Sequence, residues 1–155
     1  MATTTRALPA YRCDVLPEWI DYNGHMSEAF YVLVFGFATD QVMDEMGMDQ
    51  VYRQDTGNSL YTVEGHIRYL METGQGAELT VTTDIVNSGP KKLHLAHEMR
   101  SGGQLIATEE ILALHVNQVT GGTEAFPSSV SENITRITQS GEHQMPEWVG
   151  RKVTA

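Results

Sequence analysis

The residues best suited to chemistry lie in one short segment, residues 19–27, with the sequence WIDYNGHMS. Asp21 stands shortly before the expected start of a strongly apolar helix. A carboxylate there can act as a nucleophile or as an acid or base. The free N–H groups at a helix start can polarise a carbonyl. We therefore predict an active site here. The alternative is a turn-forming role for Asp21, since Asp-x-Asn-Gly also suits a tight turn.

The helix that must position Asp21 is expected over residues 28–46. Ser27 suits the N-cap, Glu28 in the first turn suits the helix dipole, and Gly47 is a natural stop. Apolar residues recur along it at helical spacing. Three more fill the other side of its first turns: Val32, Leu33 and Phe37. A helix that is apolar nearly all round must be wrapped by other elements.

Most of the remaining chain predicts strands. Residues 10–16 predict a short strand that Pro17 ends, and a polar loop is expected over residues 54–58. Longer strands, separated by turns that contain Gly or Pro, are expected over residues 60–72, 77–87, 91–100 and 104–118. Residues 129–140 predict a short surface helix, and the tail from Glu142 is expected to be loosely ordered.

The order of one short strand, one buried helix and four long strands indicates an α+β domain. A curved antiparallel sheet wrapped around one central helix is the hot-dog fold, whereas a lipocalin-like barrel needs about eight strands and no central helix. We expect a single such domain over residues 1–155, with its core over about residues 10–140. One sheet cannot both cover the helix and hide its own edges. Pairing of copies into a homodimer or homotetramer is therefore expected.

Alternation along residues 60–72 assigns side chains to the two faces of that strand. One face is predicted to carry Tyr61, Val63, Ile67, Tyr69 and Met71. The other face is predicted to carry Glu64, His66 and Arg68.

Composition excludes several classes of protein. The net charge is −10 and the 10 Lys and Arg are scattered, so nucleic acid is not an expected partner. Residues 1–10 lack the apolar core of a signal peptide, and the longest apolar run, residues 29–38, is shorter than the roughly 20 residues of a membrane span. Cys13 is the one cysteine, which suits a reducing compartment and a buried, inert thiol. We expect a soluble cytoplasmic protein that does not bind a membrane.

The segment around Asp21 resembles the opening of the 4-hydroxybenzoyl-CoA thioesterase family of hot-dog enzymes, Asp-x-Asp-x-x-Gly-His-x-Asn before the central helix. The second Asp matches Asp21, and Gly-His matches Gly24 and His25. Trp19 replaces the first Asp and Ser27 the final Asn. The resemblance spans roughly residues 10–120. It implies that Asp21 is the catalytic carboxylate and that the backbone N–H of Glu28 contacts the thioester oxygen.

A narrower resemblance joins four stretches: residues 17–26, 61–64, 66–68 and 92–95. Together they are similar to the betainyl-CoA thioesterases of bacterial carnitine breakdown, which also occur fused to a carnitine dehydrogenase. The implied reaction hydrolyses a small acyl-CoA, betainyl-CoA, to betaine and CoA. A trimethylammonium group is bound by aromatic faces and a carboxylate. The candidates for this role are Trp19, Tyr22, Tyr61 and Glu64.

Other residues are candidates for holding the rest of the substrate. Asn23 and His25 are close enough to Asp21 in sequence to orient the carbonyl or a water molecule. The cations expected near the CoA phosphates are Arg68, Lys91 and Lys92. The two lysines are equally suited to a solvated strand edge that discourages aggregation.

Metal and cofactor chemistry are not expected. His94 and His97 are three apart in a strand, so they face opposite sides, and the chain has no His-Glu-x-x-His motif and no Gly-x-Ser-x-Gly elbow. The coenzyme A belongs to the substrate. Two alternatives to a thioesterase stay open, a hot-dog hydratase or dehydratase and a non-catalytic acyl-CoA-binding protein. Measuring thiol release separates both from a thioesterase.

Overall fold

The computed structural model describes residues 7–141 and 145–154 of the chain. The elements, in chain order, are β1 (Tyr11–Asp14), η1 (Pro17–Trp19), α1 (Glu28–Glu45), α2 (Gln50–Thr56), β2 (Asn58–Tyr69), β3 (Glu78–Ser88), β4 (Lys92–Ser101), β5 (Gln104–Asn117) and α3 (Ser128–Ser140).

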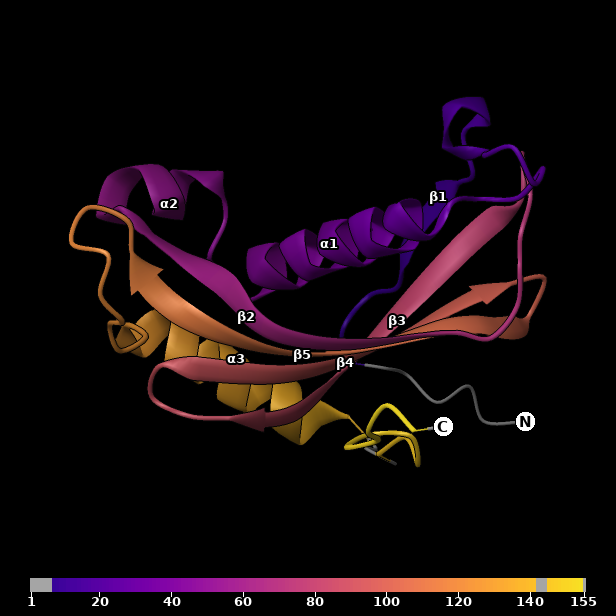
Figure 1. The fold of residues 1–155 in the computed structure, drawn as a ribbon. Helices are drawn as coiled ribbons and strands as arrows, with labels where there is room; N and C mark the ends of the chain where they lie inside the picture. Colours follow the sequence, from indigo (N-terminus) through magenta and orange to yellow (C-terminus); the bar gives the residue numbers. More distant parts are fainter. Residues whose placement is uncertain (1–6, 142–144, 155) are drawn as a thin grey trace.

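The five strands form one antiparallel sheet in the order β1-β3-β4-β5-β2. Figure 1 shows this sheet curving beneath α1. The predicted hot-dog fold is confirmed, and each predicted strand is present with its ends shifted by a few residues. β1 and β2 are the edge strands, and no strand in the described part of the chain pairs with the outer edge of β2.

Helix α1 packs on the sheet through one side. Its buried residues include Tyr31, Val34 and Phe35, which join an apolar cluster with residues of η1, β3 and β4. The C-terminal half of α1 contributes to a second cluster. There the predicted surface helix α3 adds its apolar stripe, formed by Val130, Ile134 and Ile137. The sequence places these three residues at helical spacing, so α3 buries one face only.

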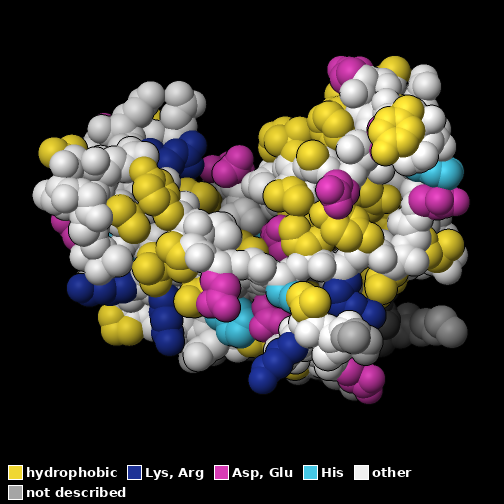
Figure 2. Space-filling model, in the orientation of Figure 1, with side chains coloured by type: hydrophobic (Ala, Val, Ile, Leu, Met, Phe, Trp, Pro, Cys, Tyr) yellow, Lys and Arg dark blue, Asp and Glu magenta, His cyan; other side chains and the backbone are white. Residues whose placement is uncertain are grey.

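The other side of α1 stays open. Val32, Leu33 and Phe37 are 44%, 40% and 37% exposed. In the single chain this side of α1 is left uncovered, because the five strands and α3 reach only its inner side. Hydrophobic side chains gather on the molecular surface over α1 and the loop before it (Figure 2).

Strand β2 departs from strict alternation at Val63. Thr62 pairs with Ala113 and Glu64 with Leu112, so a β-bulge inserts one residue between them. Residues directly opposite in an antiparallel pair share a face. The bulge therefore places Tyr61 on the same face as Glu64, and the predicted grouping of Tyr61 with Ile67 and Tyr69 is wrong.

Helix α2 lies partly where a polar loop was predicted. The Asp49 side chain accepts a hydrogen bond from the N–H of Tyr52 (2.9 Å) and caps its start, and Gly57, with a positive φ of 71°, ends it. This helix has seven residues and none of them is buried, so hydrophobic periodicity carries no signal for it.

The C-terminal tail was expected to be loosely ordered, and residues 142–144 and 155 lie outside the described residues. In the described part, the indole N–H of Trp148 donates to Glu98 (3.0 Å), and the N–H of Gly150 donates to Glu110 (2.7 Å). None of the described helices combines the length and the hydropathy that a membrane span requires.

Candidate active site

The loop that carries Asp21 is closed by its own hydrogen bonds. The N–H of Asp21 donates to His25 O (3.0 Å), and the N–H of Asn23 donates to the Asp21 Oδ1 atom (2.8 Å). Gly24 donates to Asp21 O and adopts a positive φ of 78°, which glycine reaches without strain. The turn-forming role of Asp21 is therefore present in the structure. It uses one carboxylate oxygen, and Oδ2 has no hydrogen-bond donor among the described residues.

This loop is fixed to the segment between β2 and β3 and to the end of η1. The N–H of Met26 donates to Thr73 O, and that of Ser27 donates to Trp19 O, both at 2.9 Å. The Ser27 side chain makes no capping hydrogen bond. Within the described residues no acceptor bonds the N–H groups of Glu28 and Ala29. These donors are therefore available to an oxygen that carries developing negative charge.

Three neighbouring side chains differ in how accessible they are. Trp19 is 7% exposed and stacks on Phe30, with ring centroids 5.6 Å apart, so most of its indole belongs to the core. Tyr22 lies at the loop tip and is 97% exposed. His25 is half-buried, and its Nδ1 lies 3.3 Å from a carboxylate oxygen of Glu72. Roles of Trp19, Tyr22 and His25 in binding stay predictions.

The remaining predicted residues lie elsewhere in the single chain. Glu64 pairs with Leu112, Arg68 with Thr108 and Tyr61 with Leu114, and these even-numbered residues of β5 face away from α1. Lys91 and Lys92 are exposed beside the β3–β4 turn. A hollow of about 440 Å³ on that outer face is lined by side chains of both signs, including Glu64, His66, Lys92, His94, Glu110 and Lys152.

The structure therefore brings together only some of the predicted residues. Asp21, Asn23, His25 and the N–H of Glu28 share one loop and helix start. The outer-face residues of β2 lie on the opposite side of the sheet from that helix.

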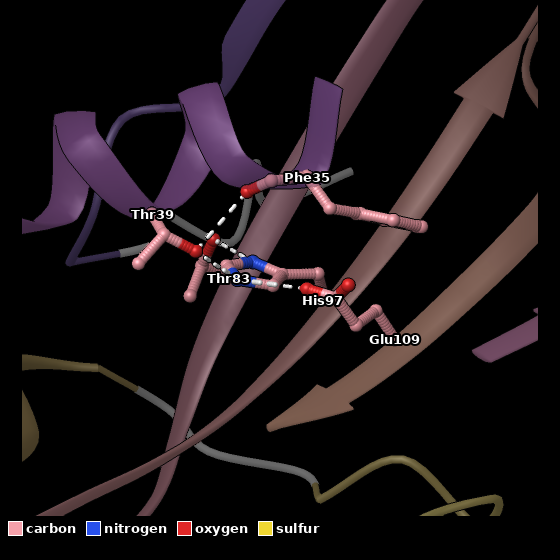
Figure 3. A network of polar contacts seen from close by, with 5 residues as sticks. All are labelled: Phe35, Thr39, Thr83, His97 and Glu109. Carbon is pink, nitrogen blue, oxygen red and sulfur yellow. Dashed lines mark hydrogen bonds and ion pairs between the residues drawn. The ribbon is translucent and has the colours of Figure 1, made fainter. Parts of the chain in front are cut away.

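A polar cluster under α1 was not predicted (Figure 3). His97 of β4 is fully buried, with Nδ1 2.8 Å from the Thr83 hydroxyl and Nε2 3.0 Å from the Thr39 hydroxyl. Its ring stacks on Phe35. Burial lowers the pKa of His97 to about 4, so the ring is neutral at neutral pH.

Glu109 of β5 belongs to the same cluster. Its Oε1 lies 3.9 Å from His97 Nε2, which is too long for a hydrogen bond, and its side chain is 8% exposed. Burial raises the pKa of Glu109 to about 7. A signal for this residue does exist in the sequence. Two consecutive glutamates in a strand point to opposite faces, so Glu109 and Glu110 cannot both face solvent on one side of the sheet.

Tyr69 of β2 links this cluster to the helix start. Its hydroxyl donates to Glu28 O (3.4 Å), and its ring meets Tyr31 edge-on, with centroids 5.2 Å apart. Burial, together with the nearby carboxyls of Glu28 and Glu109, raises the pKa of the Tyr69 phenol. Tyr69 therefore lies in the electrostatic field of both acids.

Comparison with known proteins defines the class. Residues 15–134 match the sequence profile of the Thioesterase-like superfamily, and the chain belongs to this family. It is 36% identical, over 96% of both chains, to the betainyl-CoA thioesterase of Pseudomonas aeruginosa. It is also 38% identical to the L-carnitine dehydrogenase/betainyl-CoA thioesterase of Agrobacterium fabrum, of which it covers 28%.

A solved structure shares this fold along nearly the whole chain. A hypothetical protein from Staphylococcus aureus, in complex with CoA, superimposes with a TM-score of 0.89 at 30% identity, over 94% of each chain. The family predicted from the residues around Asp21 is confirmed.

Proposed function

We propose that this protein is an acyl-CoA thioesterase that hydrolyses betainyl-CoA to betaine and CoA. The observation that supports this most directly is the identity of 36% along nearly the whole chain with a betainyl-CoA thioesterase. The local geometry agrees with that chemistry, because a carboxylate with one unbonded oxygen lies in the loop that leads into an uncapped helix start.

In the proposed mechanism the thioester carbonyl lies between Asp21 and the start of α1. The Asp21 carboxylate either attacks the carbonyl carbon or takes a proton from an attacking water molecule. The N–H of Glu28 stabilises the oxyanion that forms, and one such donor is worth about 3 kcal/mol of transition-state stabilisation. The tetrahedral adduct collapses, the C–S bond breaks and CoA leaves as its thiolate. On the nucleophilic route this leaves an acyl anhydride on Asp21, which water hydrolyses to betaine and free Asp21; on the general-base route the oxygen from water is already part of the betaine carboxylate. Protein groups alone carry these steps, and coenzyme A enters as part of the substrate.

We also propose that the active unit is a homodimer, or a homotetramer built from dimers. The free edge of β2 and the open apolar side of α1 are the surfaces that a second copy would cover. The outer-face candidates for substrate and CoA, Tyr61, Glu64, Arg68, Lys91 and Lys92, would act in such an assembly. We place the protein in the cytoplasm, where its single cysteine would stay reduced.

Replacement of Asp21 by Asn tests the catalytic assignment. The Asn side chain keeps an oxygen that can accept the hydrogen bond from the N–H of Asn23, so the turn survives while the charge is lost. We expect kcat for betainyl-CoA, measured as thiol release, to fall by about 10³-fold or more. The matched control is Glu18→Gln, an exposed carboxylate in η1, which should keep wild-type activity.

Near-normal turnover by Asp21→Asn would contradict the mechanism. Circular dichroism and binding of CoA verify that the variant is folded. A hydratase would leave the thioester intact, and a binding protein would hold it without turnover. The buried His97 does not favour a hydratase, because the hydroxyls of Thr39 and Thr83 occupy both of its ring nitrogens.

A further inference from the structure

Glu109 is a buried carboxyl group without a countercharge. It faces α1 from β5, its side chain is 8% exposed, and no described residue hydrogen bonds to it. A buried acid is usually paired or hydrogen-bonded, because an isolated charge in a dry environment is costly. Among the residues that the structure describes, the one basic group within 4 Å of it is His97, at 3.9 Å.

His97 cannot act as that countercharge. Thr39 has one hydroxyl hydrogen, which it donates to Phe35 O (3.1 Å), so Nε2 of His97 carries the proton in their contact. Nδ1 then accepts from Thr83. This arrangement satisfies a neutral ring completely, and burial keeps the ring neutral. A cation that pairs with the ionised Glu109 would therefore have to come from outside this cluster.

The side chains between Glu109 and the helix start are aromatic. Glu109 pairs with Ile67 across the β2–β5 register and Tyr69 with Ala107, so Tyr69 is the diagonal neighbour of Glu109 on the face toward α1. On α1, Glu28, Tyr31 and Phe35 follow one another at helical spacing and so form one stripe. The Tyr69 hydroxyl bonds to the first residue of that stripe. Tyr69, with Tyr31 edge-on to its ring, therefore lies between the residue of the proposed oxyanion donor and Glu109.

We propose that Glu109 is the counterion for a cationic acyl group, whose quaternary ammonium lies against Tyr69 while its thioester carbonyl is at the start of α1. This inference rests on the proposed thioesterase function and assigns its specificity. A quaternary ammonium has no hydrogen to donate and is weakly hydrated, so it loses little on entering a dry site with a carboxylate and aromatic faces. Glu64, the acid predicted for this role, lies on the outer face in a hollow that also contains Lys92 and His66.

A pair of substrates of equal shape tests the proposal. Betainyl-CoA and tert-butylacetyl-CoA differ only in that the central nitrogen, with its charge, is replaced by carbon. We expect Glu109→Gln to lower kcat/KM for betainyl-CoA by roughly 30-fold or more and to change that for tert-butylacetyl-CoA by less than about threefold. The matched control is Glu110→Gln, the next residue on the opposite face, which should keep the wild-type preference.

The pH profile gives a second readout. Among the described residues, the titratable groups around Glu109 are His97 from β4, Tyr69 from β2, and Tyr31 and Glu28 on the stripe of α1. Only the ionised Glu109 attracts the cation. The ratio of kcat/KM for the charged substrate to that for the neutral one should rise with pH around 7 in the wild type, and should be flat in Glu109→Gln.

The results with the two substrates distinguish the counterion role of Glu109 from the thioesterase function. Equal losses for both substrates in Glu109→Gln would overturn the counterion role in favour of a role in chemistry or folding, and no loss for either would overturn it as well. If the wild type hydrolyses both thioesters equally well, the thioesterase function stands and the counterion role fails. Release of thiol from neither substrate by the wild type would refute the proposed function and this inference with it.

Discussion

Strand β5 carries two consecutive glutamates, and the sheet sends them to opposite environments. Glu110 faces outward, where its carboxylate lies 2.7 Å from His94 and also accepts a hydrogen bond from the N–H of Gly150. Glu109 faces α1, where its closest histidine, His97, is 3.9 Å away. The same pair of residue types thus forms a hydrogen bond on one face and an unbonded contact on the other.

The difference follows from solvent. On the outer face, the side chains of His94 and Glu110 are 30% and 13% exposed and hydrogen bond to each other, so Glu110 is both partly solvated and bonded. Under α1 each charge must be stripped of water, which favours the neutral forms of both groups. Burial accordingly moves the pKa of His97 down to about 4 and that of Glu109 up to about 7. Glu109 has no hydrogen-bond donor among the described residues and so could still bind a cation, whereas the Glu110 carboxylate already bonds to His94 and Gly150.

The largest effect on stability is expected from His97. His97→Leu leaves the hydroxyls of Thr39 and Thr83 without their ring partners in a dry site, and should lower the free energy of unfolding by about 3 kcal/mol. Urea denaturation measures this loss. The matched variant on the outer face, His94→Leu, should lose about 1 kcal/mol or less. Comparable losses of stability in the two variants would show that the buried His97 does not stabilise the fold more than the partly exposed His94.

Glu109→Gln is expected to change the free energy of unfolding less than His97→Leu does, and to raise it rather than lower it. The folded-state pKa of Glu109, about 7, lies above the ordinary value of 4.5, so its contribution to folding is fully present below pH 4.5 and is lost as the pH rises through 7. Glutamine mimics the protonated acid. Glu109→Gln should therefore match the wild type near pH 5 and be more stable by about 2 kcal/mol near pH 8.5.

Urea denaturation at the two pH values measures the change. A stability difference that does not depend on pH would mean that Glu109 is not desolvated. If Glu109→Gln gains stability and loses the preference for the charged substrate, Glu109 is a residue that destabilises the fold but serves binding.

The smallest change in the free energy of unfolding is expected for Glu110→Gln. Glu110→Gln removes the charge that faces His94 but keeps an oxygen for the N–H of Gly150. We expect a loss below about 1 kcal/mol, smaller still at high ionic strength, because partly exposed ion pairs are weak and screened. Unfolding measured at low and high salt tests this. A large loss that salt does not reduce would place Glu110 in the same dry class as Glu109.

Local pattern predicted most of the fold. The apolar period of α1 and the turns between strands identified every long element, because both signals are carried by residues close in sequence. Helix α2 was missed because its seven residues have no buried side chain. The bulge at Val63 was missed because it arises from pairing with β5, and one inserted residue moved Tyr61 to the other face.

The amino-acid sequence by itself determined the central helix, the strands and the family, and its residue types and spacing within one loop made Asp21 the predicted catalytic residue. Only the tertiary structure decided which of two adjacent glutamates lies under α1 without a hydrogen-bond donor, that His97 is buried and neutral, and that Tyr69 lies between the helix start and Glu109. The physical reason is that charge state and burial depend on β2, β4, β5 and α1 meeting in space. No single stretch of the chain contains that information.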